Sequence, residues 1–238
     1  MDTNFSKLLI PSFVENYAIN LSLYENRKFN SFNDFFTRKL INNQFLKNED
    51  KILSPAEGRI LVYDKISMGQ EFEIKSTFID IYKLLKNAKL AKIYQNGSLA
   101  IIRLAPVDYH RYYFPVSGEI GASTQINGSL YSVSPIALNY KPSIFVENKR
   151  EFSIIENSDL GRVLFCEVGA TFVGSIVQSY EDGFIEQTAE KGFFKFGGST
   201  IILIFEENKM KFDDDLIQNT KDGFETKINV GMQIGSKI

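Results

Sequence analysis

The Gly-Gly-Ser-Thr run at residues 197–200 carries the most distinctive chemistry in this 238-residue chain. It lies between a phenylalanine-rich segment and a run of β-branched residues, in KGFFKFGGSTIILIF at 191–205. Glycines permit tightly bent backbones, and the Ser199 hydroxyl is a nucleophile that could attack the carbonyl of Gly198. The amide would become an ester, and β-elimination and hydrolysis would leave a pyruvoyl group at residue 199. A turn that leads into a strand is the alternative interpretation of this short motif.

The chain contains one histidine, His110. An imidazole titrates near neutrality, so it can both accept and return a proton. A lone histidine is also a common structural hydrogen-bonding residue. Arg111 could hold a phosphate or carboxylate with its planar guanidinium, or form an ordinary ion pair. Lys149 and Arg150 could neutralise a phosphodiester, or belong to a solvated turn.

The composition excludes several classes of function. A net charge of −2 gives no electrostatic case for nucleic acid. With a single cysteine, Cys166, the chain cannot form an internal disulfide, and a structural zinc site is not expected. No apolar run approaches the roughly 18 residues of a membrane span, and the N-terminus does not resemble a secretory signal. We therefore expect a cytoplasmic protein that is free to lie on a membrane surface.

Two regions with different patterns position these residues. Residues 1–50 are rich in aromatics at helical spacing, and Ser31 or Asn33 is predicted to cap a helix whose first turn contains Asp34. These aromatics are expected to pack on the main domain. The alternative is that some enter the headgroup layer of a membrane, helped by the basic residues Lys7, Arg27, Lys28, Arg38 and Lys39.

From residue 51 onward the pattern predicts strands punctuated by Gly, Pro and Asn. One helix is predicted at about 79–94, loops at 124–130 and 208–225, and a last short strand in the tail. The predicted fold class is α+β: a single β-rich catalytic domain, 51–238, with an N-terminal helical portion, 1–50.

Several segments, taken together and in order, resemble the phosphatidylserine decarboxylase family. They cover most of the chain from about residue 29 and are FNSFNDFFTRKL (29–40), LSPAEGRI (53–60), IRLAPVDYHRYYFPVSGEI (102–120), GSLYSVSPIAL (128–138), ENKR (147–150), VGATFVGSI (168–176) and KGFFKFGGSTIILIF (191–205). The resemblance implies a proenzyme that cuts itself between Gly198 and Ser199. The β chain would then be 1–198, and the α chain would be 199–238 with Ser199 converted to pyruvoyl.

The resemblance also implies the reaction and the partners. Phosphatidylserine would be decarboxylated to phosphatidylethanolamine and CO2 through a Schiff base to the covalent pyruvoyl group, an electron sink that needs no metal or diffusible cofactor. The enzyme would be a carboxy-lyase of phospholipid biosynthesis, peripheral at the cytoplasmic face of the cell membrane. The partners would be membrane phosphatidylserine and its own two chains; a homodimer is left open.

The resemblance assigns catalytic positions, and the chain departs from the family at two of them. His110 matches a histidine implicated in decarboxylation. Glu57, in SPAEG, stands where the family typically has Asp, and Tyr113 stands where it typically has a second His. In the family these two positions and the cleavage-site Ser form a Ser-His-Asp arrangement that activates self-cleavage. A phenol with a pKa of about 10 is a poor base near neutrality.

Three consequences of Tyr113 follow. Cleavage could proceed through strain and oxyanion stabilisation, Tyr113 could act with Glu57 in an unusual way, or the chain could stay whole. Replacement of the missing base by His110 is not expected, because residues three apart on an extended chain point to opposite faces. The alternative functions are an uncleaved lipid-binding relative and a pyruvoyl decarboxylase of a soluble amino acid.

Overall fold

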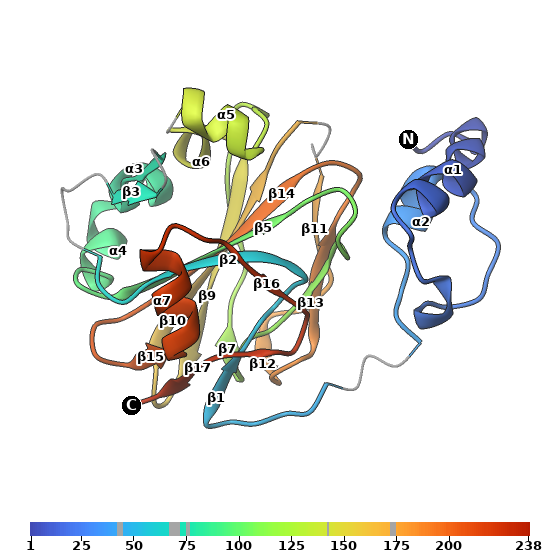
Figure 1. Ribbon diagram of the computed structural model, residues 1–238. Helices are drawn as coiled ribbons and strands as arrows, with labels where there is room; N and C mark the ends of the chain where they lie inside the picture. The colour runs from blue at the N-terminus through green and yellow to red at the C-terminus, as the bar shows by residue number, and fades with distance from the viewer. Residues whose placement is uncertain (42–44, 67–71, 75–76, 142, 172–174) are drawn as a thin grey trace.

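The computed structural model describes residues 1–41, 45–66, 72–74, 77–141, 143–171 and 175–238. Within these ranges a nine-stranded antiparallel sheet has the order β12-β7-β9-β10-β14-β5-β2-β16, with β8 paired to β9. Smaller sheets have the orders β11-β13-β6, β1-β17-β15 and β3-β4. The protein is a single β-rich domain with a few helices. The helices α1 and α2 lie to one side of the sheets (Figure 1).

The bounds of the strands follow the chain. They are β1 Lys51–Leu53, β2 Gly58–Tyr63, β3 Phe72–Ile74, β4 Thr77–Ile79, β5 Ser98–Leu104, β6 Arg111–Tyr113, β7 Gly118–Ile120, β8 Thr124–Ile126, β9 Arg150–Asn157, β10 Gly161–Gly169, β11 Ile176–Gln178, β12 Gly183–Ile185, β13 Glu190–Phe194, β14 Ser199–Phe205, β15 Met210–Phe212, β16 Thr226–Ile228 and β17 Gln233–Lys237. The helices are α1 Ile10–Asn16, α2 Phe32–Phe36, α3 Ile81–Leu85, α4 Ala88–Ile93, α5 Pro135–Tyr140, α6 Ile144–Glu147 and α7 Asp214–Lys221, with 3-10 turns at Asn4–Leu9 and Leu21–Leu23.

Strand β14 lies at the centre of the main sheet and is buried along its whole length. Ile201 and Leu203 belong to one hydrophobic cluster, whereas Ile202 and Ile204 belong to another on the opposite face. A strand covered on both faces has a continuous apolar sequence instead of an alternating one. The predicted strand at TIILIF is therefore confirmed, and its composition reflects double burial.

The start of α2 is also confirmed. Ser31 caps the helix, and its Oγ accepts a hydrogen bond from the backbone N–H of Asp34 at 3.1 Å. The apolar face of this single turn is buried through Phe32, Phe35 and Phe36. The expectation that these aromatics pack inside the protein is correct for them.

Three predicted elements were wrong. The single helix at 79–94 is two short helices, because Lys86 adopts a left-handed backbone with φ +49° and Asn87 caps a new helix by accepting from the N–H of Leu90. The segment 208–225 contains β15 and α7, whose polar sequence hides one buried anchor, Leu216. Residues 124–126 form β8, and the tail forms two strands, β16 and β17.

The small sheet β11-β13-β6 covers one face of the main sheet. Tyr112 of β6 and Phe194 of β13 belong to the same cluster as Ile201 of β14. A buried ion pair joins the two layers: Lys191 Nζ of β13 lies 2.5 Å from Glu167 Oε1 of β10, and both side chains are 0% exposed. Burial lowers the pKa of Lys191 and raises the pKa of Glu167, since each charge loses its hydration.

We predict that Lys191→Met lowers the free energy of unfolding by about 3–5 kcal/mol, because it leaves the Glu167 charge buried without its partner. The double variant Lys191→Met/Glu167→Leu should recover most of this loss. Urea unfolding of both variants in a Ser199→Ala background measures the difference. A loss of less than about 1 kcal/mol in the single variant would contradict the prediction.

Candidate active site

The proposed scissile bond lies at the head of the central strand. Ser199 is the first residue of β14, and it is paired with Leu104 of β5 on one side and Gly169 of β10 on the other. Its side chain is fully buried, and its Oγ has no hydrogen-bond partner among the described residues. Buried polar atoms are normally paired. An unpaired buried hydroxyl is thus chemically uncommitted and available to react.

The turn before Ser199 has an unusual backbone. Gly197 has φ +145°, a value that favours glycine over residues with a side chain. The backbone N–H of Phe196 donates to Asn33 Oδ1 at 2.7 Å. The N-terminal portion therefore holds one end of the glycine turn, and the ladder of β14 holds the other.

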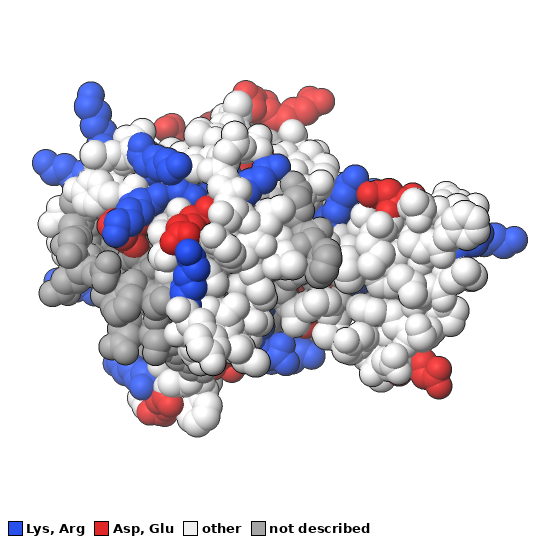
Figure 2. Space-filling view, turned by 90° about the horizontal axis from the view of Figure 1, so that it is seen from above, with Lys and Arg blue, Asp and Glu red and all other residues white. Residues whose placement is uncertain are grey.

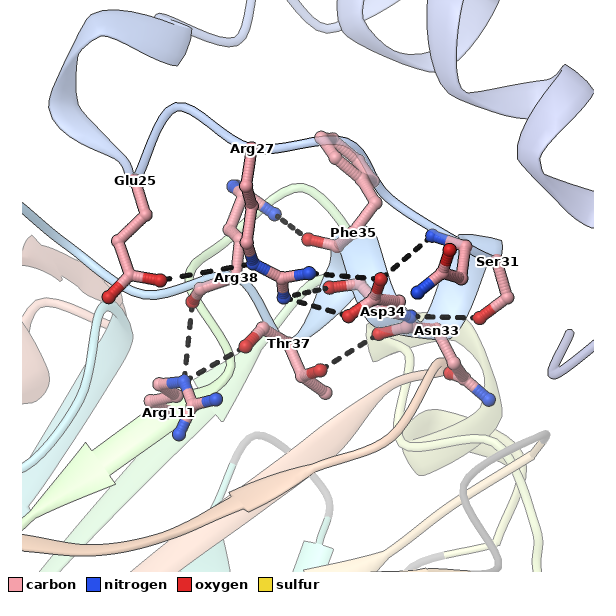
Figure 3. Close-up of polar contacts among 10 residues, drawn as sticks. Glu25, Arg27, Ser31, Asn33, Asp34, Phe35, Thr37, Arg38 and Arg111 are labelled. Carbon is pink, nitrogen blue, oxygen red and sulfur yellow. Dashed lines mark hydrogen bonds and ion pairs between the residues drawn. The ribbon is translucent and has the colours of Figure 1, made fainter.

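Arg27 and Arg111 fix the helix α2 that carries Asn33, and the network is drawn in Figure 3. Arg27 binds both carboxylate oxygens of Asp34, at 2.7 and 3.0 Å. Arg111 donates through Nε to the carbonyls of Thr37, at 2.9 Å, and Arg38, at 3.3 Å. Its Nη1 pairs with Glu190 at 2.7 Å. The ion-pair interpretation of Arg111 is therefore confirmed.

Aromatic rings enclose His110 beside the turn. The Phe36 ring centroid lies 4.2 Å from that of His110 and 5.2 Å from that of Phe196. Phe32 packs against Phe196 at 5.0 Å. These contacts exclude water from the region around the glycine turn.

His110 is fully buried and is held in one orientation. Its Nδ1 lies 2.7 Å from the carbonyl oxygen of Asp108, whereas its Nε2 has no hydrogen-bond partner of good geometry in the described part of the chain. Burial lowers the pKa of His110 to about 3; the carbonyl of Asp108 opposes this shift, the charge of Arg38 adds to it, and the Gly197 backbone slightly opposes it. The ring is therefore neutral at physiological pH.

Glu57 and Tyr113 both contact Tyr109. Glu57 Oε2 accepts from the backbone N–H of Tyr109 at 3.2 Å, and the Tyr113 hydroxyl lies 3.0 Å from that of Tyr109. Burial raises the pKa of Glu57, as does the nearby charge of Asp108. Because Ser199 Oγ has no hydrogen-bond partner, neither residue is hydrogen-bonded to it. The roles that the resemblance assigns to Glu57 and Tyr113 stay predictions.

His110 and Tyr113 lie in different surroundings, as their spacing predicted. The ring of His110 packs on Phe36, whereas Tyr113 packs with Tyr24, Tyr109 and Phe45. The two side chains are therefore not interchangeable in position.

A cavity of about 510 Å³ opens beside the glycine turn. Its walls come from the end of β5, the segment before α5 and the end of β10, and they are Arg103, Leu104, Ala105, Pro106, Ser132, Val133, Ser134, Ala170, Thr171, Phe196, Gly197 and Gly198. The lining mixes apolar side chains with hydroxyls. A group at residue 199 would be reached through this cavity.

Two asparagines that shape the site were missed by the sequence reasoning. Asn33 was expected only as a helix cap, but it binds a residue 163 positions away. Asn148 is fully buried, and its Nδ2 donates to the carbonyls of Tyr131 and Gly169, both at 2.8 Å. It ties the loop before α5 to the end of β10. Neither role leaves a local pattern, because the partners are distant in sequence.

The ENKR segment does not offer Arg150 as a phosphate ligand. Its guanidinium is buried and donates to the carbonyls of Leu84, Lys83 and Asn148 at 2.6–2.8 Å. In the VGATFVGSI segment, residues 172–174 lie outside the described residues.

The described residues contain neither a cluster of three or more His, Cys, Asp or Glu suited to a metal ion nor a helix long and apolar enough to span a bilayer. The fold and site together define a class: a β-rich α+β protein with a reactive-serine turn at the head of its central strand, next to an enclosed histidine.

Comparison with known proteins narrows the class to a family. The family model for phosphatidylserine decarboxylase matches residues 32–236. Proteins named phosphatidylserine decarboxylase proenzyme are 46% identical in Ruminiclostridium cellulolyticum, 45% in Clostridium tetani and 46% in Clostridium botulinum strain Alaska E43. Each alignment covers 100% of this chain and 81–82% of the relative. The chain belongs to the phosphatidylserine decarboxylase family.

We predict that Gly197→Ala destabilises the uncleaved protein by about 1–3 kcal/mol, because a side chain is strained at φ +145°. Gly198→Ala is the matched control: its Cβ would meet only Val133, at 3.5 Å, and its effect should stay below about 1 kcal/mol. Thermal unfolding in a Ser199→Ala background separates the two. Equal effects at both positions would show that the turn is not strained as described.

Proposed function

We propose that this chain is a self-processing phosphatidylserine decarboxylase. It cuts itself between Gly198 and Ser199 into a β chain, 1–198, and an α chain, 199–238, and converts phosphatidylserine to phosphatidylethanolamine and CO2. One observation carries the proposal: a fully buried, unpartnered Ser199 hydroxyl directly after a glycine turn, in a chain of this family. The curated relatives carry the name proenzyme, which supports self-processing.

The surroundings of residue 199 suit a covalent pyruvoyl group. After cleavage, residue 199 would be the first residue of β14, still paired to Leu104 and Gly169 on either side. The group would thus be held rigidly, with the cavity of about 510 Å³ in front of it. When formed, a pyruvoyl group supplies an electron sink for loss of CO2 from a bound amine.

The chain's own residues position the substrate and exclude water. Ser132, Ser134 and Thr171 provide hydroxyls that can bind the polar headgroup in the cavity. Phe36 and Phe196 cover His110 and keep the reacting carbon away from solvent. The unpartnered Nε2 of His110 can hold and return a proton on this side of the cavity.

The substrate is a membrane lipid, and the N-terminal portion offers a surface to meet it. Apolar side chains are exposed there at Phe5, Leu8, Leu9, Tyr17, Leu21 and Leu23. In Figure 2 the lobe on the right, which contains this portion, shows mostly uncharged side chains. Such exposed apolar side chains are typical of membrane contact. They support a peripheral location, which we propose to be the cytoplasmic face of the membrane.

We predict that the purified chain separates under denaturing conditions into fragments of about 22 and about 5 kDa, the shares of 198 and 40 residues in 27.1 kDa. Mass spectrometry of the small fragment should find a pyruvoyl group in place of the N-terminal serine. The mature protein should release CO2 from vesicles that contain phosphatidylserine.

Two controls make this test specific. Ser199→Ala should stay whole and inactive, because it lacks the nucleophile. Free serine at equal concentration should be a much poorer substrate than the vesicles; faster release of CO2 from free serine would replace the lipid with a soluble amino acid. A native chain that stays whole after long incubation would overturn the proposed function.

A further inference from the structure

Self-cleavage needs a base for the Ser199 hydroxyl, and the residue at the position that the resemblance assigns is Tyr113. We propose that His110 is this base in the present chain, through the free lone pair of its Nε2. The inference rests on the proposed function, because it concerns the step that would create the reactive group. It gives the single histidine a role in maturation besides its role in decarboxylation.

The hydrogen bond of His110 determines which ring nitrogen can accept a proton. A backbone carbonyl only accepts hydrogen bonds, so the contact of 2.7 Å with the Asp108 oxygen requires a proton on Nδ1. In the neutral ring Nε2 is then the acceptor. This atom is buried and has no partner among the described residues. The orientation resembles that of a histidine base whose other nitrogen is held by a second group.

The layers of the fold bring the two unpartnered atoms to one region. Side chains alternate along a strand, so Ser199 shares a face of β14 with Ile201 and Leu203, and this is the face covered by the small sheet with β6. His110 directly precedes β6. The Gly197 backbone, two residues before Ser199, lies close enough to the ring to affect its pKa. Imidazole and hydroxyl thus share one enclosed, dry space.

Tyr113 is engaged elsewhere. Its hydroxyl lies 3.0 Å from that of Tyr109, inside a cluster with Tyr24 and Phe45. A phenol acts as a base only as phenolate, and its unperturbed pKa is about 10. A neutral imidazole already has its lone pair at physiological pH.

The steps balance with one base and one water. Nε2 takes the proton of Ser199 Oγ as Oγ bonds to the Gly198 carbonyl carbon, and it returns the proton to the Ser199 nitrogen as the peptide C–N bond breaks, which leaves an ester. A base then takes the Cα proton of residue 199, and the Gly198 carboxylate departs to leave dehydroalanine. Water converts this enamine to the pyruvoyl ketone with release of ammonia.

The pH dependence of cleavage distinguishes the two bases without any mutation. We predict that freshly translated native chain, shifted to pH values from about 5.5 to 8.5, cleaves at rates that differ by less than about threefold, because the neutral imidazole fraction stays constant far above its pKa. With Tyr113 as the base the rate should rise about tenfold per pH unit. Such a rise would overturn the inference.

The neighbouring charges do not confuse this reading. The charge that acts on the His110 ring is that of Arg38, which stays protonated throughout. Asp108 accepts from the backbone N–H of Ala105, and Arg111 is paired with Glu190. Glu57 lies on the Tyr109 side, where it binds the backbone N–H of Tyr109.

Variants give the second readout. Tyr113→Phe should cleave within about twofold of the native rate, whereas His110→Gln should be slower by on the order of 100-fold or more. Circular dichroism and thermal unfolding of His110→Gln check its folding, and the native pH profile decides if it does not fold. Ser199→Ala is the uncleaved reference.

The outcomes separate the two levels of the argument. Native chain that stays whole at every pH would overturn the proposed function itself. Native chain that cleaves while His110→Gln cleaves equally fast would overturn only the role of His110, and it would assign cleavage to the strained turn. Loss of cleavage in Tyr113→Phe with retention in His110→Gln would restore Tyr113 as the base.

Discussion

The hydrogen bonding of β14 to strands on both sides is the constraint on which the rest of the site depends. Ser199 is fixed between Leu104 and Gly169, so its backbone cannot relax when the preceding turn is bent. Gly197 absorbs the bend with a positive φ. A nucleophile on a rigid element beside a turn of this kind is held close to its own carbonyl, which favours an intramolecular reaction over competing ones.

The N-terminal portion completes the site from outside the sheets. Its helix α2 supplies Asn33, which holds the N–H of Phe196, and Phe36, which covers His110. Salt bridges and carbonyl contacts of Arg27 and Arg111 keep this helix in place. The portion with exposed apolar side chains is therefore the same one that encloses the catalytic histidine. Contact with lipid and formation of a dry site are physically linked through one short helix.

Buried polar groups in this protein serve different purposes. Arg150 and Asn148 are bound to backbone carbonyls, and Lys191 is paired with Glu167. These satisfied groups specify how loops and layers meet. Ser199 Oγ and His110 Nε2 are buried without a partner. Unsatisfied groups carry an energetic penalty, and their presence on one face of the glycine turn is consistent with a site kept ready for chemistry.

The sequence by itself determined the strands, the capping of α2 by Ser31, and the glycine turn before Ser199, because alternation, caps and glycines act over a few neighbouring residues. It also identified His110 and the unusual Tyr113. Only the tertiary structure decided that Tyr113 contacts Tyr109, that Asn33 holds Phe196, and that the predicted helix at 79–94 breaks at Lys86. Each of these depends on groups brought together by the packing of layers, where burial and pairing between distant residues outweigh local preference.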